Sequence, residues 1–295
     1  MKKILMSAIV AGSALASLSA AHADTLGKIA DSGQITLAYR ESSVPFSYLV
    51  GPSEPVGFSV EIAKAVAEEV KKQLGKPDLK VNWQPVTSQN RIPLLANGTI
   101  DLECGSTTNN STRAQDVAFA TNHFYTGTRL LTKKSSGIQN YEDLKGKNIA
   151  TTTGTTNFQV LRRYDREHNL GMNILPGKDH ADSFLLVETG RALAFGMDDI
   201  LLFGLIANSK DPSAYEVVGE ALQVEPYACM LRKDDPKFKE LVDGVINGMM
   251  DSGQFATLYD TWFMQPIPPS NVPLGLPMSE ELKKNITEHS DKPAT

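Results

Sequence analysis

The sequence predicts an α/β fold built as two lobes that face each other across a ligand cleft. Three observations support this expectation. Apolar alternating segments and amphipathic helical segments follow one another between residues 34 and 104. The same alternation starts again after a polar connection at residues 133–143. In both halves, polar side chains stand at the ends of the expected strands, where open α/β sheets bind their ligands.

The N-terminal residues have the three parts of a secretory signal peptide. Met1-Lys2-Lys3 is basic, residues 4–20 are apolar or small, and Ala21-His22-Ala23 fits a cleavage site before Asp24. We therefore expect an exported, soluble protein, and no lipid anchor because no Cys follows that site. No later apolar run approaches the ~20 residues that are needed to cross a bilayer.

The composition argues against several kinds of partner. The net charge is −5, and it becomes more negative by two when the Lys residues of the signal peptide are removed. No basic stripe is available to neutralise phosphates, so we expect no nucleic-acid partner. Cys104 and Cys229 should form a disulfide in an oxidising compartment, with two buried free thiols as the alternative. The His residues show no ligand-like spacing, so we expect no metal and no other cofactor.

The first half of the chain should form three strands with helices between them. In order, we expect a helix at residues 24–33, a strand at 34–39, a helix at 59–74, a strand at 79–83, a helix at 87–97 and a strand at 100–104. Ser59 should cap the second helix, and Pro93 should lie in the first turn of the third, where a missing N–H matters least. Arg113 should open a further short helix.

The second half should repeat this order before the chain returns to the first lobe. We expect strands at residues 124–131, 148–152, 172–175 and 191–197, helices at 158–168, 182–188 and 200–208, and extended segments at 215–219 and 226–231. Asp235-Pro236 should then start a long helix, followed by helices at residues 255–263 and 279–288. The last helix should be peripheral and the residues after it loose.

These elements give a division of the chain into lobes. The crossings between the lobes should lie near residues 125–128 and 219–225. The resulting parts are a signal peptide at residues 1–23, a first lobe at 24–127 and 220–265, a second lobe at 128–219 and a C-terminal extension at 266–295.

Short hydrogen-bonding side chains follow the strand at residues 100–104. Residues 105–112 are Gly, Ser, Thr or Asn, and Arg113 comes directly after them. Such a row closed by one guanidinium suits a small anion such as a carboxylate; the alternative is a polar turn with a solvated Arg. Arg40, Ser88 and Arg91 follow neighbouring strands, so they are candidates to converge on one site with Ser106.

Polar groups also follow the strands of the second half. Gly154-Thr155-Thr156 precedes a helix whose N–H groups could hold an anion, unless the Thr residues only cap that helix. Of Asp198 and Asp199, one should cap a helix and the other should be free to meet an ammonium group. His180 falls in an expected loop, where it could simply be exposed. Ser106, His180 and Asp198 supply the residue types of a hydrolase triad, but no Gly-x-Ser-x-Gly elbow surrounds Ser106, so we do not expect catalysis.

Several runs resemble one family of transport proteins. They are RESSVPFSY at residues 40–48, TSQNRIPLL at 87–95, ECGSTTNN at 103–110, GTT at 154–156, KDH at 178–180, MDD at 197–199 and CMLRKDDP at 229–236. Together with the signal peptide they resemble the periplasmic glutamate/aspartate-binding proteins of ABC importers, in the polar amino-acid group of type II periplasmic binding proteins. The resemblance covers nearly the whole mature chain. One departure is Ser59, which replaces an acid in Gly57-Phe58-Ser59-Val60-Glu61.

The resemblance implies a binding protein that closes its cleft around L-glutamate or L-aspartate. It assigns the α-carboxylate of the ligand to Arg113, helped by Thr108 and by the helix start at Thr155 and Thr156. It assigns the α-ammonium group to Asp198 with Ser106. It places the second carboxylate in a cationic pocket made by Arg40, Ser88, Arg91 and His180.

The same resemblance implies a monomer in the periplasm that delivers its ligand to the permease of an ABC importer, which has a cytoplasmic ATPase. Cys104 and Cys229 would both lie in the first lobe. We do not expect enzymatic activity. The alternative is a periplasmic lyase or dehydratase on the same fold.

Overall fold

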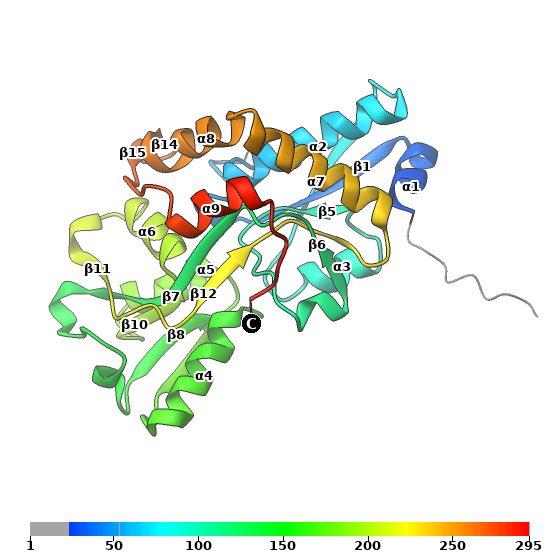
Figure 1. Cartoon of the computed structure of the whole chain (residues 1–295). Coiled ribbons are helices and arrows are strands. Elements are labelled where there is room, and N and C mark those ends of the chain that lie inside the picture. Colours follow the sequence, from blue (N-terminus) through cyan, green and yellow to red (C-terminus); the bar gives the residue numbers. More distant parts are fainter. Residues whose placement is uncertain (1–23, 53, 295) are drawn as a thin grey trace, which may run out of the picture.

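The computed structural model describes residues 24–52 and 54–294; the expected signal peptide at residues 1–23 lies outside the described residues. Figure 1 shows two lobes, each with its own β-sheet and its own helices. The prediction of a two-lobed α/β fold is therefore confirmed. Among the described residues, no helix is both long and apolar enough to span a membrane.

The first lobe is built on a five-stranded sheet. Its strands are β1 (Gln34–Tyr39), β4 (Lys80–Pro85), β5 (Leu102–Glu103), β6 (Val117–Phe119) and β13 (Met230–Arg232). They lie in the order β4-β1-β5-β13-β6, with β1 parallel to β4 and β5 and with β13 antiparallel to both of its neighbours. Because β13 comes from the last part of the chain, this sheet forms only when the chain returns from the second lobe.

The second lobe is built on a mixed sheet. Its strands are β7 (Phe124–Lys133), β8 (Asn148–Thr152), β9 (Asn173–Gly177), β10 (Ala194–Asp198), β11 (Tyr215–Val218) and β12 (Val224–Tyr227). The order is β11-β7-β10-β8-β9, and β12 pairs with the first part of β7.

Two antiparallel strands connect the lobes. In sequence, β7 leads from the first sheet to the second, and β12 leads back. Their first-lobe ends are anchored in an aromatic cluster, in which Phe124 of β7 lies 4.8 Å from Phe46 and Tyr227 of β12 lies 5.2 Å from Phe46, measured between ring centroids. Side chains at this end of the two strands are therefore held firmly by the first lobe.

Helices cover both sheets. The first lobe carries α1 (Thr25–Ser32), α2 (Phe58–Leu74), α3 (Arg91–Ala96), α7 (Pro236–Asp251), α8 (Gln254–Tyr259) and α9 (Glu280–Glu288). The second lobe carries α4 (Thr156–His168), α5 (His180–Glu188) and α6 (Asp199–Ala207). Small elements complete the chain: β2 (Ser42–Ser43), β3 (Ser47–Tyr48), β14 (Pro266–Ile267), β15 (Val272–Pro273), the 3₁₀ turns Arg113–Gln115, Lys134–Ser136, Glu142–Leu144 and Pro212–Ala214, and a π-helical turn at Asp260–Met264.

The start of α2 corrects one prediction. Gly57, and not Ser59, is the N-cap residue, with φ of 134°. A Cβ atom at this position would lie 2.3 Å from the carbonyl oxygen of Phe46, so only glycine fits. Ser59 lies inside the helix, where its hydroxyl donates to the carbonyl of Gly105 at 3.2 Å.

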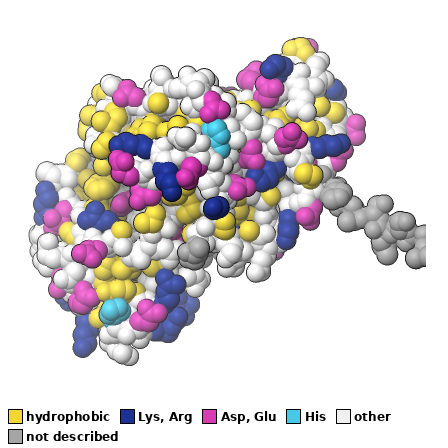
Figure 2. All heavy atoms as spheres, viewed as in Figure 1, with side chains coloured by type: hydrophobic (Ala, Val, Ile, Leu, Met, Phe, Trp, Pro, Cys, Tyr) yellow, Lys and Arg dark blue, Asp and Glu magenta, His cyan; other side chains and the backbone are white. Residues whose placement is uncertain are grey.

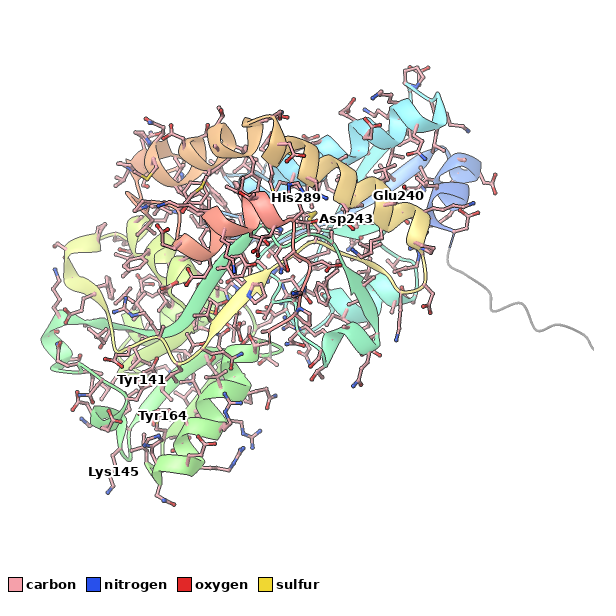
Figure 3. The ribbon with its side chains drawn as sticks, in the orientation of Figure 1. Tyr141, Lys145, Tyr164, Glu240, Asp243 and His289 are labelled. Carbon is pink, nitrogen blue, oxygen red and sulfur yellow. A yellow bond between two sulfur atoms is a disulfide. The ribbon has the colours of Figure 1, made fainter. Side chains whose placement is uncertain are left out.

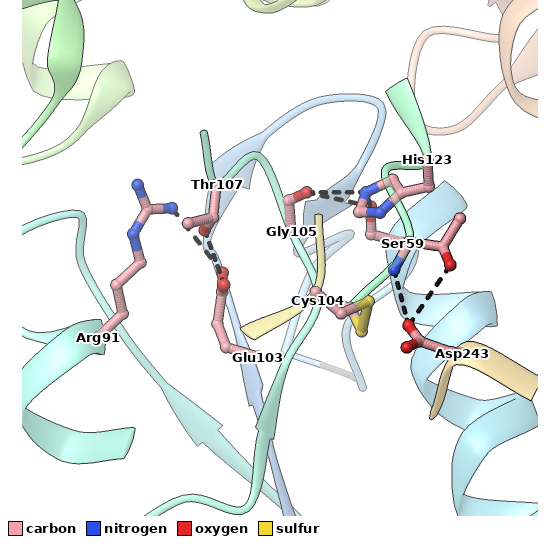
Figure 4. The surroundings of a disulfide bond; sticks show 10 residues. Ser59, Arg91, Glu103, Cys104, Gly105, Thr107, His123 and Asp243 are labelled. Atoms are coloured by element: carbon pink, nitrogen blue, oxygen red, sulfur yellow. Dashed lines mark hydrogen bonds and ion pairs between the residues drawn. A yellow bond between two sulfur atoms is a disulfide. The ribbon is translucent and has the colours of Figure 1, made fainter. Parts of the chain in front are cut away.

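The disulfide predicted between Cys104 and Cys229 is present, and it joins the end of β5 to the segment before β13 (Figure 4). Figure 4 also shows that the residues on either side of Cys104 are fixed by contacts. Glu103 forms an ion pair with Arg91, and the carbonyl of Gly105 contacts the ring of His123. Glu103 accepts a hydrogen bond from Thr107 at 2.7 Å. The polar loop that begins at Gly105 is thus fixed to the first sheet.

The C-terminal segment also differs from expectation, because residues 290–294 are bound rather than loose. The side chain of Asn109 donates to the carbonyl of Asp291 at 2.7 Å, and the side chain of Asn122 donates to that of Lys292 at 2.9 Å. The N–H of Ala294 in turn donates to the carbonyl of Asn109 at 2.9 Å. Figure 3 shows the end of α9, at His289, beside the part of α7 that carries Asp243. The tail therefore crosses the first lobe and ends on the polar loop.

Candidate functional site

A cavity with about 190 Å³ of empty space lies between the lobes. Its lining residues are Ser88, Arg91, Ser106, Thr108 and Arg113 from the first lobe, and Thr155, Thr156, Asn157, His180, Met197, Asp198 and Leu201 from the second. Every site residue named in the sequence analysis except Arg40 is in this set. The empty space is small, so only a small molecule could occupy the cavity.

Arg113 reaches across the cleft from the first lobe. It begins a single 3₁₀ turn and not a longer helix, and its backbone N–H donates to the side chain of Asn110 at 2.9 Å. One guanidinium nitrogen donates to the carbonyl of Thr108 at 2.9 Å, and another donates to the carbonyl of Gly154 in the second lobe at 3.2 Å. Burial lowers the pKa of Arg113, and Glu225 opposes this effect. Its charge is thus directed into the cleft by two backbone carbonyls.

Arg91 supplies a second buried cation. It is the first residue of α3, is 2% exposed, and donates to the carbonyl of Ser106 at 3.3 Å. Its Nη1 lies 3.8 Å from Oε1 of Glu103, and its Nε has no partner among the described residues. Burial lowers the pKa of Arg91 to about 9, with Glu103 acting in the opposite direction, so the side chain stays charged at neutral pH. A buried guanidinium with a free donor can receive a ligand oxygen.

The hydroxyl groups of Ser106 and Ser88 differ in their hydrogen bonding. Ser106 donates to the hydroxyl of Ser43 at 3.2 Å. The hydroxyl of Ser88 is buried and has no hydrogen-bond partner within the part of the chain that the structure describes. Ser88 thus offers an unused hydrogen-bonding group next to Arg91.

The start of α4 brings second-lobe groups to the cavity. Thr155 is the N-cap, and its hydroxyl accepts from the N–H of Phe158 at 3.2 Å and donates to the carbonyl of Thr152 at 2.7 Å. Thr155 therefore does cap its own helix. The hydroxyl of Thr156 instead donates to Glu225 at 2.7 Å. The helix still presents its first N–H groups and its positive dipole end to the cavity.

Asp198 is the acidic group of the cavity. Its Oδ1 accepts from Asn157 at 2.7 Å, and its Oδ2 accepts from the hydroxyl of Tyr227. Burial raises the pKa of Asp198 to about 7, and the charge of Glu225 adds to this effect. Asp199 is used locally, since it accepts from the N–H of Ile200 and from Thr126, both at 2.7 Å. Of the two aspartates, only Asp198 lines the cavity.

His180 corrects the expectation of a loop residue, because it is the first residue of α5 and is 1% exposed. Its Nδ1 lies 3.0 Å from the hydroxyl of Thr152, and its Nε2 lies 3.4 Å from Nη2 of Arg40. Burial lowers the pKa of His180 to about 3, and the charge of Arg40 contributes. The ring is therefore neutral near pH 7 and adds hydrogen-bonding capacity but no charge.

Arg40 contacts His180 but does not itself line the cavity. It is fully buried, and its Nη2 donates to Asp179 of the second lobe at 2.5 Å. Burial works against the charge on Asp179, but Arg40 outweighs it and lowers the pKa of Asp179 to about 2. Nε and Nη1 of Arg40 have no hydrogen-bond partner among the described residues. This pair is a second polar link across the cleft.

Several groups around the cavity were not predicted from the sequence. Asn157, Met197 and Leu201 line it, while Glu225 and Tyr227 bind polar groups that line it. Asn157 could have been suspected, because it directly follows the polar run at residues 154–156. Glu225 and Tyr227 gave no signal, because they lie in an ordinary strand pattern.

Within residues 24–52 and 54–294, no group of three or more His, Cys, Asp or Glu is arranged to hold a metal ion. Figure 2 shows acidic and basic side chains mixed over much of this face, with basic side chains gathered over α4.

The chain is similar over most of its length to proteins of known function. The chain is 50% identical over 271 residues to the L-glutamate/L-aspartate-binding protein of Pseudomonas aeruginosa, covering 92% of this chain and 90% of that protein. It is 48% identical over 290 residues to the glutamate/aspartate import solute-binding protein of Escherichia coli, covering 98% and 96%.

Among solved structures, a mutant of ArgBP from T. maritima superposes with a TM-score of 0.73 at 26% identity, covering 82% of this chain and all of that one. Residues 35–265 match the family described as bacterial extracellular solute-binding proteins, family 3. The chain therefore belongs to the bacterial extracellular solute-binding proteins of family 3.

Proposed function

We propose that this protein captures L-glutamate or L-aspartate by closing its cleft, and that it delivers the amino acid to an ABC importer. The observation that carries the proposal is the set of charges around one small cavity: Arg91 and Arg113 line it, and Asp198 lies on the opposite lobe. An acidic amino acid carries two carboxylates and one ammonium group, which match two cations and one anion. Both relatives described above are named for glutamate and aspartate.

Each group of the ligand has a proposed partner. Arg113 and the first N–H groups of α4 hold the α-carboxylate, together with main-chain N–H groups of Thr108, Thr155 and Thr156. Asp198 and Ser106 hold the α-ammonium group. The side-chain carboxylate lies near Arg91, Ser88, His180 and Arg40. Nε of Arg91 and the hydroxyl of Ser88 have no hydrogen-bond partner among the residues that the structure describes, and this supports the last assignment.

The word import in the name of the Escherichia coli relative supports the proposed cellular setting. The mature protein is a periplasmic monomer that acts after removal of residues 1–23, and its partners are the permease subunits in the inner membrane. In this proposal the first lobe comprises residues 24–127 and 220–265, the second lobe comprises residues 128–219, and residues 266–295 form a C-terminal extension. The pairing of β12 with the first part of β7 supports crossings near residues 125–128 and 219–225.

Isothermal titration calorimetry with L-glutamate, L-aspartate, L-glutamine and L-asparagine tests the proposal. The acids should bind at least about 100-fold more tightly than the amides, because an amide leaves a buried guanidinium without its counter-charge. Equal binding of acids and amides, or no binding of the acids, would overturn it.

Mass spectrometry of the released ligand tests the alternative of a lyase or dehydratase. The transport proposal expects the bound acid to be recovered unchanged. Its conversion to a second compound would support an enzyme and contradict a binding protein.

A further inference from the structure

Glu225 is a fully buried carboxylate to which the proposed ligand contacts give no role. It lies on β12, opposite Thr126 of β7, in the pair of strands that connects the lobes. A buried charge is unfavourable unless hydrogen bonds or counter-charges compensate it. The groups that compensate Glu225 therefore indicate what this residue does.

Two of these groups belong to different lobes. The hydroxyl of Thr108, which follows β5 in the first lobe, donates to Oε2 of Glu225 at 2.7 Å. The hydroxyl of Thr156, which starts α4 in the second lobe, donates to the same oxygen at 2.7 Å. A third donor, the side-chain amide of Gln223, binds Oε1 at 3.1 Å. One carboxylate oxygen thus joins the two walls of the cavity.

The same hydrogen bonds fix the orientation of both hydroxyl groups. A threonine hydroxyl has one proton, and in both residues this proton is directed to Glu225. The two hydroxyl oxygens, which lie 3.3 Å apart, are left with lone pairs only. They can accept a hydrogen bond from an ammonium group or a guanidinium, but they cannot donate one to a carboxylate.

We propose that Glu225 is a positioning residue that latches the closed cleft by accepting hydrogen bonds from Thr108 and Thr156 at one oxygen. The latch rests on the closure proposed above. It stabilises the closed form after capture, and it makes the two hydroxyls face an amino acid as acceptors. The carboxylate of the ligand is then left to Arg113 and to backbone N–H groups.

The kinetics of L-glutamate binding to Glu225→Gln test this role. The amide keeps the shape of the side chain but removes the charge that holds two hydroxyl protons. Bonds to charged groups are strong, so we expect the dissociation rate to rise about 10- to 100-fold. The association rate should change by less than about threefold, because the latch forms after capture. Small-angle X-ray scattering at a fixed, subsaturating glutamate concentration should show a smaller closed population.

Three further variants separate a latch from a merely structural hinge residue. Thr156→Val should reproduce the faster dissociation, and Thr156→Ser should restore the slow rate because it restores the hydroxyl. Adding Glu225→Gln to Thr156→Val should change the dissociation rate little further, since Thr156→Val has already removed the bond from Glu225 to the second lobe. Glu220→Gln, which changes an exposed carboxylate of the same connecting segment, should behave as the wild type.

The outcomes distinguish the latch from the proposed function. If the wild type binds L-glutamate and Glu225→Gln dissociates at the wild-type rate, the latch is wrong and the function stands. A folded Glu225→Gln variant that loses only association rate or thermal stability would also overturn the latch. If the wild type binds no acidic amino acid, the proposed function fails, and the latch fails with it.

Discussion

Asp198 shows how a single buried group can make ligand binding depend on pH. Its pKa is raised from 3.8 to about 7, first by burial and then by the charge of Glu225. A carboxyl with a raised pKa holds its proton more tightly in the folded protein than in the unfolded chain. The free energy of unfolding should therefore fall as pH rises from about 4 to about 7 in the absence of ligand.

Ligand affinity should change with pH in the opposite sense. In the proposed binding mode an ammonium group pairs with the ionised form of Asp198, so binding below pH 7 must release the proton of this residue. Between pH 8 and pH 6 we expect the affinity for L-glutamate to fall about tenfold. Calorimetry in buffers of different ionisation enthalpy measures both the affinity and the released proton. Asp198→Asn should bind more weakly at every pH and lose this slope; a slope that persisted would assign the titration to another group.

Arg91 should determine selectivity for the acidic side chain. Arg91→Ala removes the buried cation proposed to meet the second carboxylate, so L-glutamate should lose roughly 10²- to 10³-fold in affinity, and L-glutamine much less. The change also leaves Glu103, 3.8 Å away, without its counter-charge. The double variant Arg91→Ala/Glu103→Gln removes that secondary defect and should keep the altered selectivity. Equal losses for glutamate and glutamine, measured by calorimetry, would contradict the assignment.

At the scale of elements, the C-terminal segment is the part that most changes the expected picture. Its contacts with Asn109 and Asn122 run through backbone groups of residues 290–294. Asn109 directly follows Thr108, which lines the cavity. The tail therefore supports the loop that carries a proposed ligand contact.

Deletion of residues 289–295 should destabilise the protein and loosen this loop. Loss of several backbone hydrogen bonds, each worth about 0.5–1.5 kcal/mol, should lower Tm by about 5 °C. Affinity for L-glutamate should fall by less than about tenfold, because Arg113 remains in place. Lys292→Ala is the matched control: this side chain is exposed and the contact uses the main chain, so Tm should not change. Differential scanning calorimetry that found the deletion as stable as the control would show that the tail is dispensable.

Most elements could be predicted from local pattern, and the errors share one physical cause. Alternation placed β1 and β8 at their observed bounds, and Asp235-Pro236 does start α7. The cap of α2 was missed because it depends on a carbonyl of residue 46, which approaches Gly57 only in the folded chain.

Most of the candidate site could also be predicted from local sequence patterns. Polar residues near strand ends indicated nine of the twelve residues that line the cavity, but not Asn157, Met197 and Leu201. Glu225 could not be found, because the two hydroxyls that it binds are 117 and 69 residues away in the sequence. Local patterns report which groups face a cleft, but not which buried strand residue connects them.

At the scale of the whole molecule, the two lobes touch through backbone as well as through side chains. Gly154 of the second lobe has φ of +80° and lies against the first lobe, where a Cβ would be 2.7 Å from Cα and N of Gln89. Its carbonyl also accepts from Arg113 at 3.2 Å. The closed arrangement therefore leaves no space for a side chain at this position.

Gly154→Ala should consequently hinder closure without preventing folding. The added methyl group meets backbone atoms, which cannot move aside as a flexible side chain would, so the lobes must stay apart by a fraction of an ångström or more. We expect the affinity for L-glutamate to fall by at least about 100-fold, since a shift of this size breaks the hydrogen bonds of Arg113 and Glu225 across the cleft.

Gly190→Ala is the matched control, because Gly190 lies in the same lobe with φ of +73° and has nothing within 4 Å of an added Cβ. Both variants carry similar backbone strain and should lose similar stability, of about 1 kcal/mol. Calorimetry and small-angle X-ray scattering should then separate them: the control closes on glutamate, whereas Gly154→Ala stays open. If both variants bound glutamate equally well, closure would not bring Gly154 against residues 88–89, and the described arrangement of the lobes would not be the ligand-holding one.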